Sequence, residues 1–133
     1  MDLLEELAAE RDIRKLLALY ARLADDIGAT AAWAELFAEH GALILGPQRI
    51  EGRAALQAWL AAAQAGPPMR HLMLNPVISV DSPDTATVTM DMALLRGADG
   101  QWVVHASPRY ADRLVKTAQG WKFLERQLEN RRP

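Results

Sequence analysis

The sequence predicts an α+β domain in which helices cover one face of a curved, antiparallel sheet. Three observations indicate this fold class. Apolar residues recur at three- and four-residue spacing through the first half of the chain, whereas the second half alternates apolar and polar residues as strands do. Three turn-rich segments, DSPD, GADG and TAQG, divide the second half. Helices gathered early and hairpins gathered late are typical of an α+β domain.

Three helices are predicted in the first half. Residues 3–24 form an Ala-, Leu- and charge-rich segment without proline, and Gly28 is suited to end that helix. Thr30 is placed to cap a short second helix. We expect the second helix to end at His40-Gly41, where the histidine supplies a last-turn cation and the glycine a stop. After a short strand at residues 42–45, a third helix begins near residue 52 and must stop before the sequence GPP.

Four β-rich runs follow, at residues 69–80, 85–95, 102–116 and 121–128. They are expected to form an antiparallel meander. In the second run one face is apolar and the other carries threonines and an aspartate, so the apolar face is expected to point inward. That apolar face consists of Ala86, Val88, Met90, Met92 and Leu94. On the first run, His71, Met73 and Asn75 share a face, which suits a largely apolar pocket with few polar anchors.

The composition limits the function classes. A chain of 133 residues is expected to form one domain, residues 1–133, that folds without a metal or disulfide. It contains no cysteine, which excludes thiol chemistry and suits a reducing cytoplasm, where we expect the protein to act. The net charge of -2, with both signs scattered, gives no electrostatic footprint for nucleic acid. The apolar runs are too short for a membrane helix, and the acidic start is unlike a secretory signal.

Four segments, in this order and spacing, resemble the SnoaL-like family of the nuclear transport factor 2-like superfamily. They are IRKLLALYARLADD, WAELFAEHGAL, IEGRAALQAWL and YADRLVKTAQGWKFLERQL, and the resemblance spans most of the chain. It implies a cone-shaped sheet around an internal pocket whose mouth the helices help to form. It also implies a homodimer or higher homo-oligomer formed through the outer sheet face, where Leu72 and Leu74 present apolar side chains.

Dehydratases and dehydrochlorinases of this family use an aspartate and a histidine, and the matching positions here are Asp25 and His71. The resemblance also matches Tyr20 to a tyrosine of the dehydratases and Arg126 to an arginine of the dehydrochlorinases. The dehydratases carry a second carboxylate where this chain has Leu94, which is a departure from their pattern.

An aspartate and histidine pair has a chemical logic independent of the family. Neutral imidazole is a base near neutral pH, and a carboxylate behind it fixes the tautomer and stabilises the imidazolium that forms. Asp25 would orient His71, and His71 would abstract a proton. Tyr20 could then donate to developing negative charge, and Arg126 could hold a substrate oxygen or a leaving anion. No cofactor and no metal is needed for such an elimination or isomerisation.

The sequence therefore predicts a cofactor-independent lyase or isomerase acting on a small hydrophobic, oxygenated molecule such as a steroid, terpenoid or polyketide. The residues predicted to line the substrate pocket are Met73, Met90, Met92, Leu94 and Trp59. Two other functions stay open. One is a non-catalytic binding protein in which His71 only hydrogen-bonds a ligand, and the other is a small assembly subunit of a larger enzyme.

Each candidate side chain also has a structural interpretation. Asp25 could belong to turn chemistry before Gly28, and Tyr20 could be an ordinary buried hydroxyl. An ideal helix would place Tyr20 and Asp25 about 140° apart, so they share a pocket only if the helix ends or bends between them. Arg126 could form a surface cross-strand pair with a carboxylate. His105 is a weaker site candidate, and the three histidines show no metal-ligand spacing.

Overall fold

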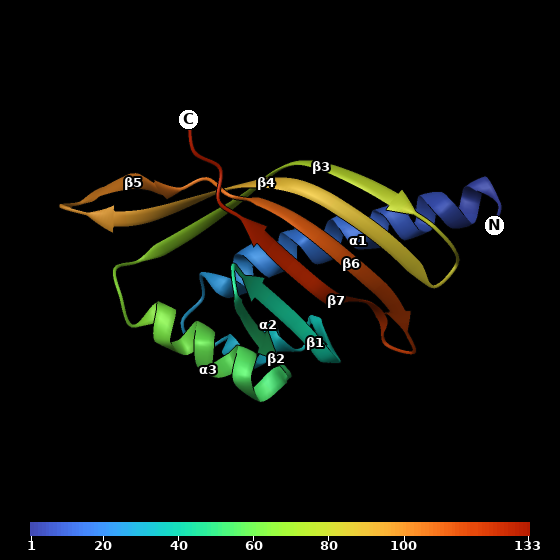
Figure 1. The fold of residues 1–133 in the computed structure, drawn as a ribbon, viewed down its shortest axis with the longest axis horizontal. Coiled ribbons are helices and arrows are strands. Elements are labelled where there is room, and N and C mark those ends of the chain that lie inside the picture. Colours follow the sequence, from blue (N-terminus) through green and yellow to red (C-terminus); the bar gives the residue numbers. More distant parts are fainter.

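A computed structural model describes all residues, 1–133. Three helices precede most of the seven strands (Figure 1). The helices are α1 (Leu3–Ala24), α2 (Thr30–Ala34) and α3 (Arg53–Gln64). The strands are β1 (Phe37–Leu45), β2 (Gln48–Glu51), β3 (Met69–Val80), β4 (Thr85–Ala98), β5 (Gln101–Ala106), β6 (Arg109–Thr117) and β7 (Gly120–Glu129).

The strands form one curved sheet in the order β2-β1-β7-β6-β4-β3, and β5 pairs with the end of β4. All pairs are antiparallel except β1 with β7, which is parallel. Helix α1 lies across one face of the sheet and packs mainly against β3, while α2 and α3 pack together near β1 (Figure 1). The hairpin of β4 and β5 extends beyond the rest of the sheet (Figure 1). The predicted α+β class, with a mostly antiparallel curved sheet, is confirmed.

The core fills the space between the sheet and the helices. The inward side chains of β4 from Ala86 to Met92 are buried, as their alternation predicts, together with apolar residues of α1 and β7. The capping box of Asp2 and Glu5 opens α1, and the helix ends at Ala24. None of the helices is both long and apolar enough to cross a membrane.

The prediction for the second helix is wrong at both ends. Ala29 precedes the first helical turn, and the hydroxyl of Thr30 accepts a hydrogen bond from Gln57 of α3 instead of capping α2. The helix ends before Phe37, because Phe123 N–H donates to Leu36 O and draws the chain into the sheet beside β7. His40 and Gly41 consequently belong to β1 rather than to a helix end.

Gly41 has a packing role within β1. A Cβ at this position would lie 2.7 Å from the carbonyl oxygen of Phe123 and 3.0 Å from that of Ala38. The pairing of β1 with β7 shifts register between Phe37 and Ala42, so the two backbones approach closely there. The residue that looks like a helix stop in the sequence is therefore needed for close strand contact.

Two further strand predictions need correction. The run 102–116 is divided into β5 and β6 at Ser107-Pro108, and Pro108 accepts a hydrogen bond from Met92 N–H. Asn75 does not share the inner face with His71. A bulge between Leu74 and Val77 gives Asn75 a φ of 54° and turns its side chain outward, where its amide donates to Asp91 at 3.1 Å.

Candidate active site

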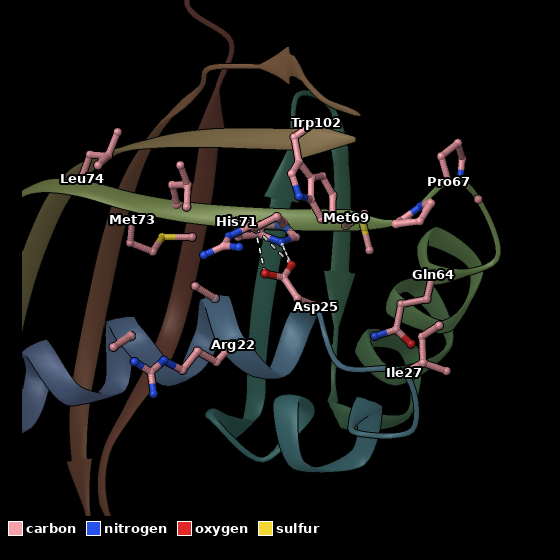
Figure 2. Close-up of a pocket in the computed structure, with 16 residues that line it drawn as sticks. Arg22, Asp25, Ile27, Gln64, Pro67, Met69, His71, Met73, Leu74 and Trp102 are labelled. Atoms are coloured by element: carbon pink, nitrogen blue, oxygen red, sulfur yellow. Dashed lines mark hydrogen bonds and ion pairs between the residues drawn. The ribbon is translucent and has the colours of Figure 1, made fainter. Parts of the chain in front are cut away.

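The site is built where the carboxyl end of α1 meets the beginning of β3. Asp25 is the residue that follows the last turn of α1, and His71 is the third residue of β3. Asp25 Oδ1 lies 2.5 Å from His71 Nδ1. The same carboxylate accepts the backbone N–H of His71, at 2.9 and 3.1 Å from its two oxygens. Figure 2 shows Asp25 directed from the helix toward His71 on the strand.

These contacts define the tautomer of His71. An ionised carboxylate only accepts hydrogen bonds, so Nδ1 of the neutral ring carries the proton and Nε2 has the free lone pair. No residue of the protein hydrogen-bonds Nε2. The His71 side chain is 10% exposed and that of Asp25 is 22% exposed, so the pair is largely shielded from water. The arrangement is that of a base held by a carboxylate.

An apolar cavity of about 150 Å³ lies inside the cone on one side of His71. Most of its lining is apolar, with the polar groups of His71, Tyr20, Tyr110 and Arg96 and the indole of Trp33 converging on it. The indole N–H of Trp33 is buried and has no hydrogen-bond partner in the protein. A cavity of this volume holds a molecule about the size of benzene. A steroid or polyketide is larger than the cavity.

Asp25 does not line this inner cavity. It lines an outer groove of about 810 Å³ that follows β3 between the end of α1 and the segment before β3. Tyr20 lines the inner cavity, and its ring meets the ring of His71 edge-on with centroids 6.4 Å apart. Asp25 keeps helical backbone angles as the cap of α1, so the two side chains stay far apart in angle and reach His71 from different sides.

Of the five predicted substrate-lining residues, three line the inner cavity. They are Trp59, Met92 and Leu94. Met73 lies on the outer groove. Met90 is buried in the core, with its sulfur 3.0 Å from Nη2 of Arg126. Neither Met73 nor Met90 reaches the cavity, since β3 and β4 carry them past it along the sheet.

Arg126 lines neither hollow. It is fully buried and forms two hydrogen bonds to Asp112, its register partner across β6 and β7, at 2.9 and 3.1 Å. The predicted cross-strand pair with a carboxylate is therefore present, but in the core and not on the surface. The guanidinium carbon also lies 4.2 Å from the ring centroid of Tyr20 and 3.9 Å from that of Tyr110.

Burial disfavours both charges of this pair. It lowers the pKa of Arg126, but the carboxylate of Asp112 and the phenols of Tyr20 and Tyr110 together outweigh it, so the pKa of Arg126 is raised. Burial also raises the pKa of Asp112, and the guanidinium of Arg126 opposes this rise only in part. Nη1 of Arg126 has no hydrogen-bond partner. The guanidinium thus packs against the rings of Tyr20 and Tyr110. It does not line the inner cavity, where a substrate would lie.

The two tyrosines of the chain, Tyr20 and Tyr110, give a pH prediction. Burial raises the pKa of Tyr20, and it raises the pKa of Tyr110 well above the usual value. The unfolded chain ionises near pH 10, so between that pH and the folded pKa values the native state holds more protons. The contribution of these two phenols to stability is therefore constant below about pH 10 and falls as the pH rises further.

We expect tyrosinate absorbance to appear only together with loss of near-ultraviolet circular dichroism during an alkaline titration. Tyr110→Phe, which keeps the ring, serves as the comparison and removes half of the absorbance change. Ionisation of both phenols near pH 10 with the circular dichroism intact would contradict the burial of the two hydroxyls.

Sequence reasoning missed Tyr110, Arg96 and Asp112. A signal was available for Asp112, because strict alternation places it on the same face as Tyr110 and Leu114, so a charge interrupts an apolar face. Arg96 lines the inner cavity and donates to Pro67 O at 2.6 Å, which no local pattern indicates. No group of three or more side chains is arranged to hold a metal ion.

Comparison with known proteins places this geometry in a family. A curved sheet with helices around an internal cavity is the architecture of the nuclear transport factor 2-like fold. The chain belongs to the SnoaL-like domain family, whose model matches residues 5–127. No functionally curated protein matches the sequence.

Solved structures agree with this assignment. A protein of unknown function from Mycobacterium tuberculosis is 28% identical, with a TM-score of 0.90, over 100% of this chain and 78% of that one. A nuclear transport factor 2-like protein from Novosphingobium aromaticivorans is 27% identical, with a TM-score of 0.87, over 96% and 84% of the two chains. A candidate scytalone dehydratase from the same organism is 21% identical, with a TM-score of 0.83 and coverage of 96% and 87%. The last similarity shows the fold alone.

Proposed function

We propose that this protein is a cofactor-independent lyase or isomerase in which His71 removes a proton from carbon. The observation that carries the proposal is the contact between Asp25 and Nδ1 of His71, which leaves Nε2 as a base on a ring that lines an apolar cavity. A buried imidazole with one nitrogen held by a carboxylate and the other free is the arrangement of a general base.

The proposed reaction begins with transfer of a carbon-bound proton to Nε2 of His71. In an elimination, the electrons of the broken C–H bond form a carbon–carbon double bond, and the leaving group departs with its bonding electrons. In an isomerisation, the electrons move toward a carbonyl, and the proton returns from Nε2 to another carbon. Tyr20 lines the same cavity and its ring meets that of His71 edge-on, so its hydroxyl would stabilise negative charge on oxygen.

The volume of the cavity limits the size of the substrate group that can lie beside His71. Pockets for drug-sized ligands enclose about 300 to 1,000 Å³, whereas this one encloses about 150 Å³. A small oxygenated ring or a short acyl segment fits beside His71. The steroid, terpenoid and polyketide classes predicted from the sequence fit only if most of the molecule stays outside the cavity.

The orientation of His71 can be tested without a substrate. At a pH high enough for imidazole to be neutral, ¹⁵N NMR of the parent should show one tautomer, with the proton on Nδ1 and a bare Nε2. Asp25→Ala removes the carboxylate that accepts from Nδ1, so the signals should move toward a mixture with the Nε2-protonated form. His71→Gln assigns the signals.

Asp26→Ala is the matched control for this measurement, since Asp26 is the neighbouring, exposed aspartate. It should leave the tautomer unchanged. If Asp25→Ala also leaves the tautomer unchanged, Asp25 does not orient the ring and the proposed catalytic pair is wrong. Tight ligand binding without turnover, in a protein that does show the tautomer shift, would favour the binding-protein alternative.

A further inference from the structure

Two hollows meet at His71, and their linings have only one other residue in common. The inner cavity and the outer groove share His71 and Met69 and no further side chain. The ring of His71 is held in place by the carboxylate of Asp25. The backbone of Met69 is held in the sheet, but its side chain is partly buried, unbranched and flexible, and no hydrogen bond fixes it. Movement of Met69 is therefore the simplest way to connect the two hollows.

The outer groove has the volume that the inner cavity lacks. At about 810 Å³ it lies within the range of small-molecule sites. Apolar side chains of its lining are exposed to solvent, with Ile27 80% exposed, Trp102 50% and Leu74 44%. Figure 2 shows Ile27, Gln64 and Pro67 near one end of the groove, and Arg22 and Met73 toward the other.

The charged groups of the groove are mostly cationic. Arg22 of α1 and Arg70 of β3 both line it and are exposed, and their guanidinium groups form no ion pair or hydrogen bond with the protein. The only carboxylate in the lining belongs to Asp25, and His71 occupies it through Nδ1 and the backbone N–H. Elsewhere on the sheet, arginines such as Arg49, Arg109 and Arg113 are paired with carboxylates. Unpaired guanidinium groups beside apolar side chains suit an anionic amphiphile.

We propose that the substrate is an anionic amphiphile that is divided between the two hollows. Its small oxygenated head enters the inner cavity between Met69 and His71, and its apolar body lies in the groove. Its carboxylate or phosphate group is bound by Arg22 and Arg70. The placement of the head in the inner cavity rests on the function proposed above. The binding of the carboxylate or phosphate group by the arginines does not.

A set of three probes tests this arrangement: phenyloctanoate, phenyloctyl phosphate and the neutral phenyloctanol. Each carries a phenyl group small enough for the inner cavity. Binding is measured by calorimetry on the parent protein. Both anions should bind at least about tenfold more tightly than the alcohol, since the alcohol offers the arginines no charge. A preference for the carboxylate or for the phosphate distinguishes a fatty-acid-like tail from a phosphorylated carrier.

Variants at the arginines locate the anionic group. Arg22→Gln and Arg70→Gln should each weaken binding of phenyloctanoate about threefold to tenfold and leave phenyloctanol unchanged. The matched control is Arg14→Gln, which removes an exposed arginine from the same helix outside the groove. It should change neither affinity. Arginine variants that bind like the control, or an alcohol that binds as tightly as the carboxylate, would overturn the proposal.

The head is located by NMR of labelled methionine methyl groups. Met92 lines the inner cavity only and Met73 the groove only, so a phenyl ring in the cavity should shift the Met92 signal by its ring current. A shift at Met73 alone would mean that the whole probe lies in the groove, and it would contradict the proposed division of the ligand between the two hollows.

Sedimentation tests whether a dimer covers the groove. If a dimer covers the groove and the anions do not bind, the groove is an interface and the proposal is wrong.

Failure of this proposal and failure of the proposed chemistry give different results. If the anions bind through the arginines but the His71 tautomer does not change in Asp25→Ala, the anion-binding site is supported and the proposed general base is wrong. If the tautomer changes but the anions do not bind through the arginines, the general base is supported and the anion-binding site is wrong.

Discussion

Arg126→Met should lower the free energy of unfolding by about 3 to 5 kcal/mol. The substitution leaves the carboxylate of Asp112 buried and without its cation, and it removes the charge that lies against the rings of Tyr20 and Tyr110. Denaturation by urea, followed by circular dichroism, measures the loss. The double variant Arg126→Met with Asp112→Leu removes both charges and should recover most of the stability, because a buried ion pair can be replaced by apolar residues at little cost.

An exposed arginine provides the comparison for Arg126. Arg113 pairs with Glu125 on the outer face, and its side chain is 64% exposed. Arg113→Met should cost less than about 1 kcal/mol. If Arg126→Met costs no more than Arg113→Met, or if the double variant is as unstable as the single one, the buried pair does not have the role that its geometry indicates.

His71→Gln should lower kcat/KM by about 10²- to 10⁴-fold on any substrate that the parent protein converts, which is the usual contribution of a general base. Asp25→Asn should cause a loss of similar order, since the amide does not stabilise the imidazolium that forms during proton transfer. A substrate is sought by screening compounds that have an acidic C–H bond beside a leaving group or a carbonyl. Steady-state kinetics then gives kcat/KM for the parent protein and the variants.

Asp26→Asn controls for the effect of neutralising a carboxylate at this helix end, and it should retain the activity of the parent. Unfolding curves for all three variants separate lost chemistry from lost structure. Activity that survives in His71→Gln would mean that another group takes the proton.

The secondary structure was predictable where local patterns and tertiary contacts agree. Helix α1 and strand β3 begin and end as predicted. A capping residue opens α1 and Gly28 follows its end, whereas the prolines before Met69 and the DSPD turn bound β3 despite the bulge within it. The second helix was mispredicted because His40 and Gly41 resemble a helix end, whereas pairing with β7 draws this segment into the sheet. Secondary-structure propensity reflects the local sequence only. It cannot account for pairing with a parallel strand from a distant part of the chain.

The candidate site was predictable only in part. The positions of Asp25 and His71 follow from family resemblance, and the end of α1 explains how Asp25 reaches the strand. The burial of Arg126 was not predictable from alternation. A bulge in β7 opposite Arg113 and Leu114 turns Glu125 outward and Arg126 inward, and one inserted residue of this kind leaves no clear mark in a sequence. The division of the hollow into a cavity and a groove depends on side-chain volumes, which a pattern of polarity does not contain.

The parallel pairing of β1 with β7 has a consequence for how the chain folds. Phe37 pairs with Phe123, so the middle of the sheet joins segments from opposite ends of the sequence. On the ribosome, the hairpin of β1 and β2 emerges long before β7, and neither β1 nor β6 can complete its hydrogen bonds until β7 is made. The nascent protein therefore exposes the open edge of β1 throughout most of its synthesis, and that of β6 only briefly before β7 is made. It is during this interval that aggregation competes with folding.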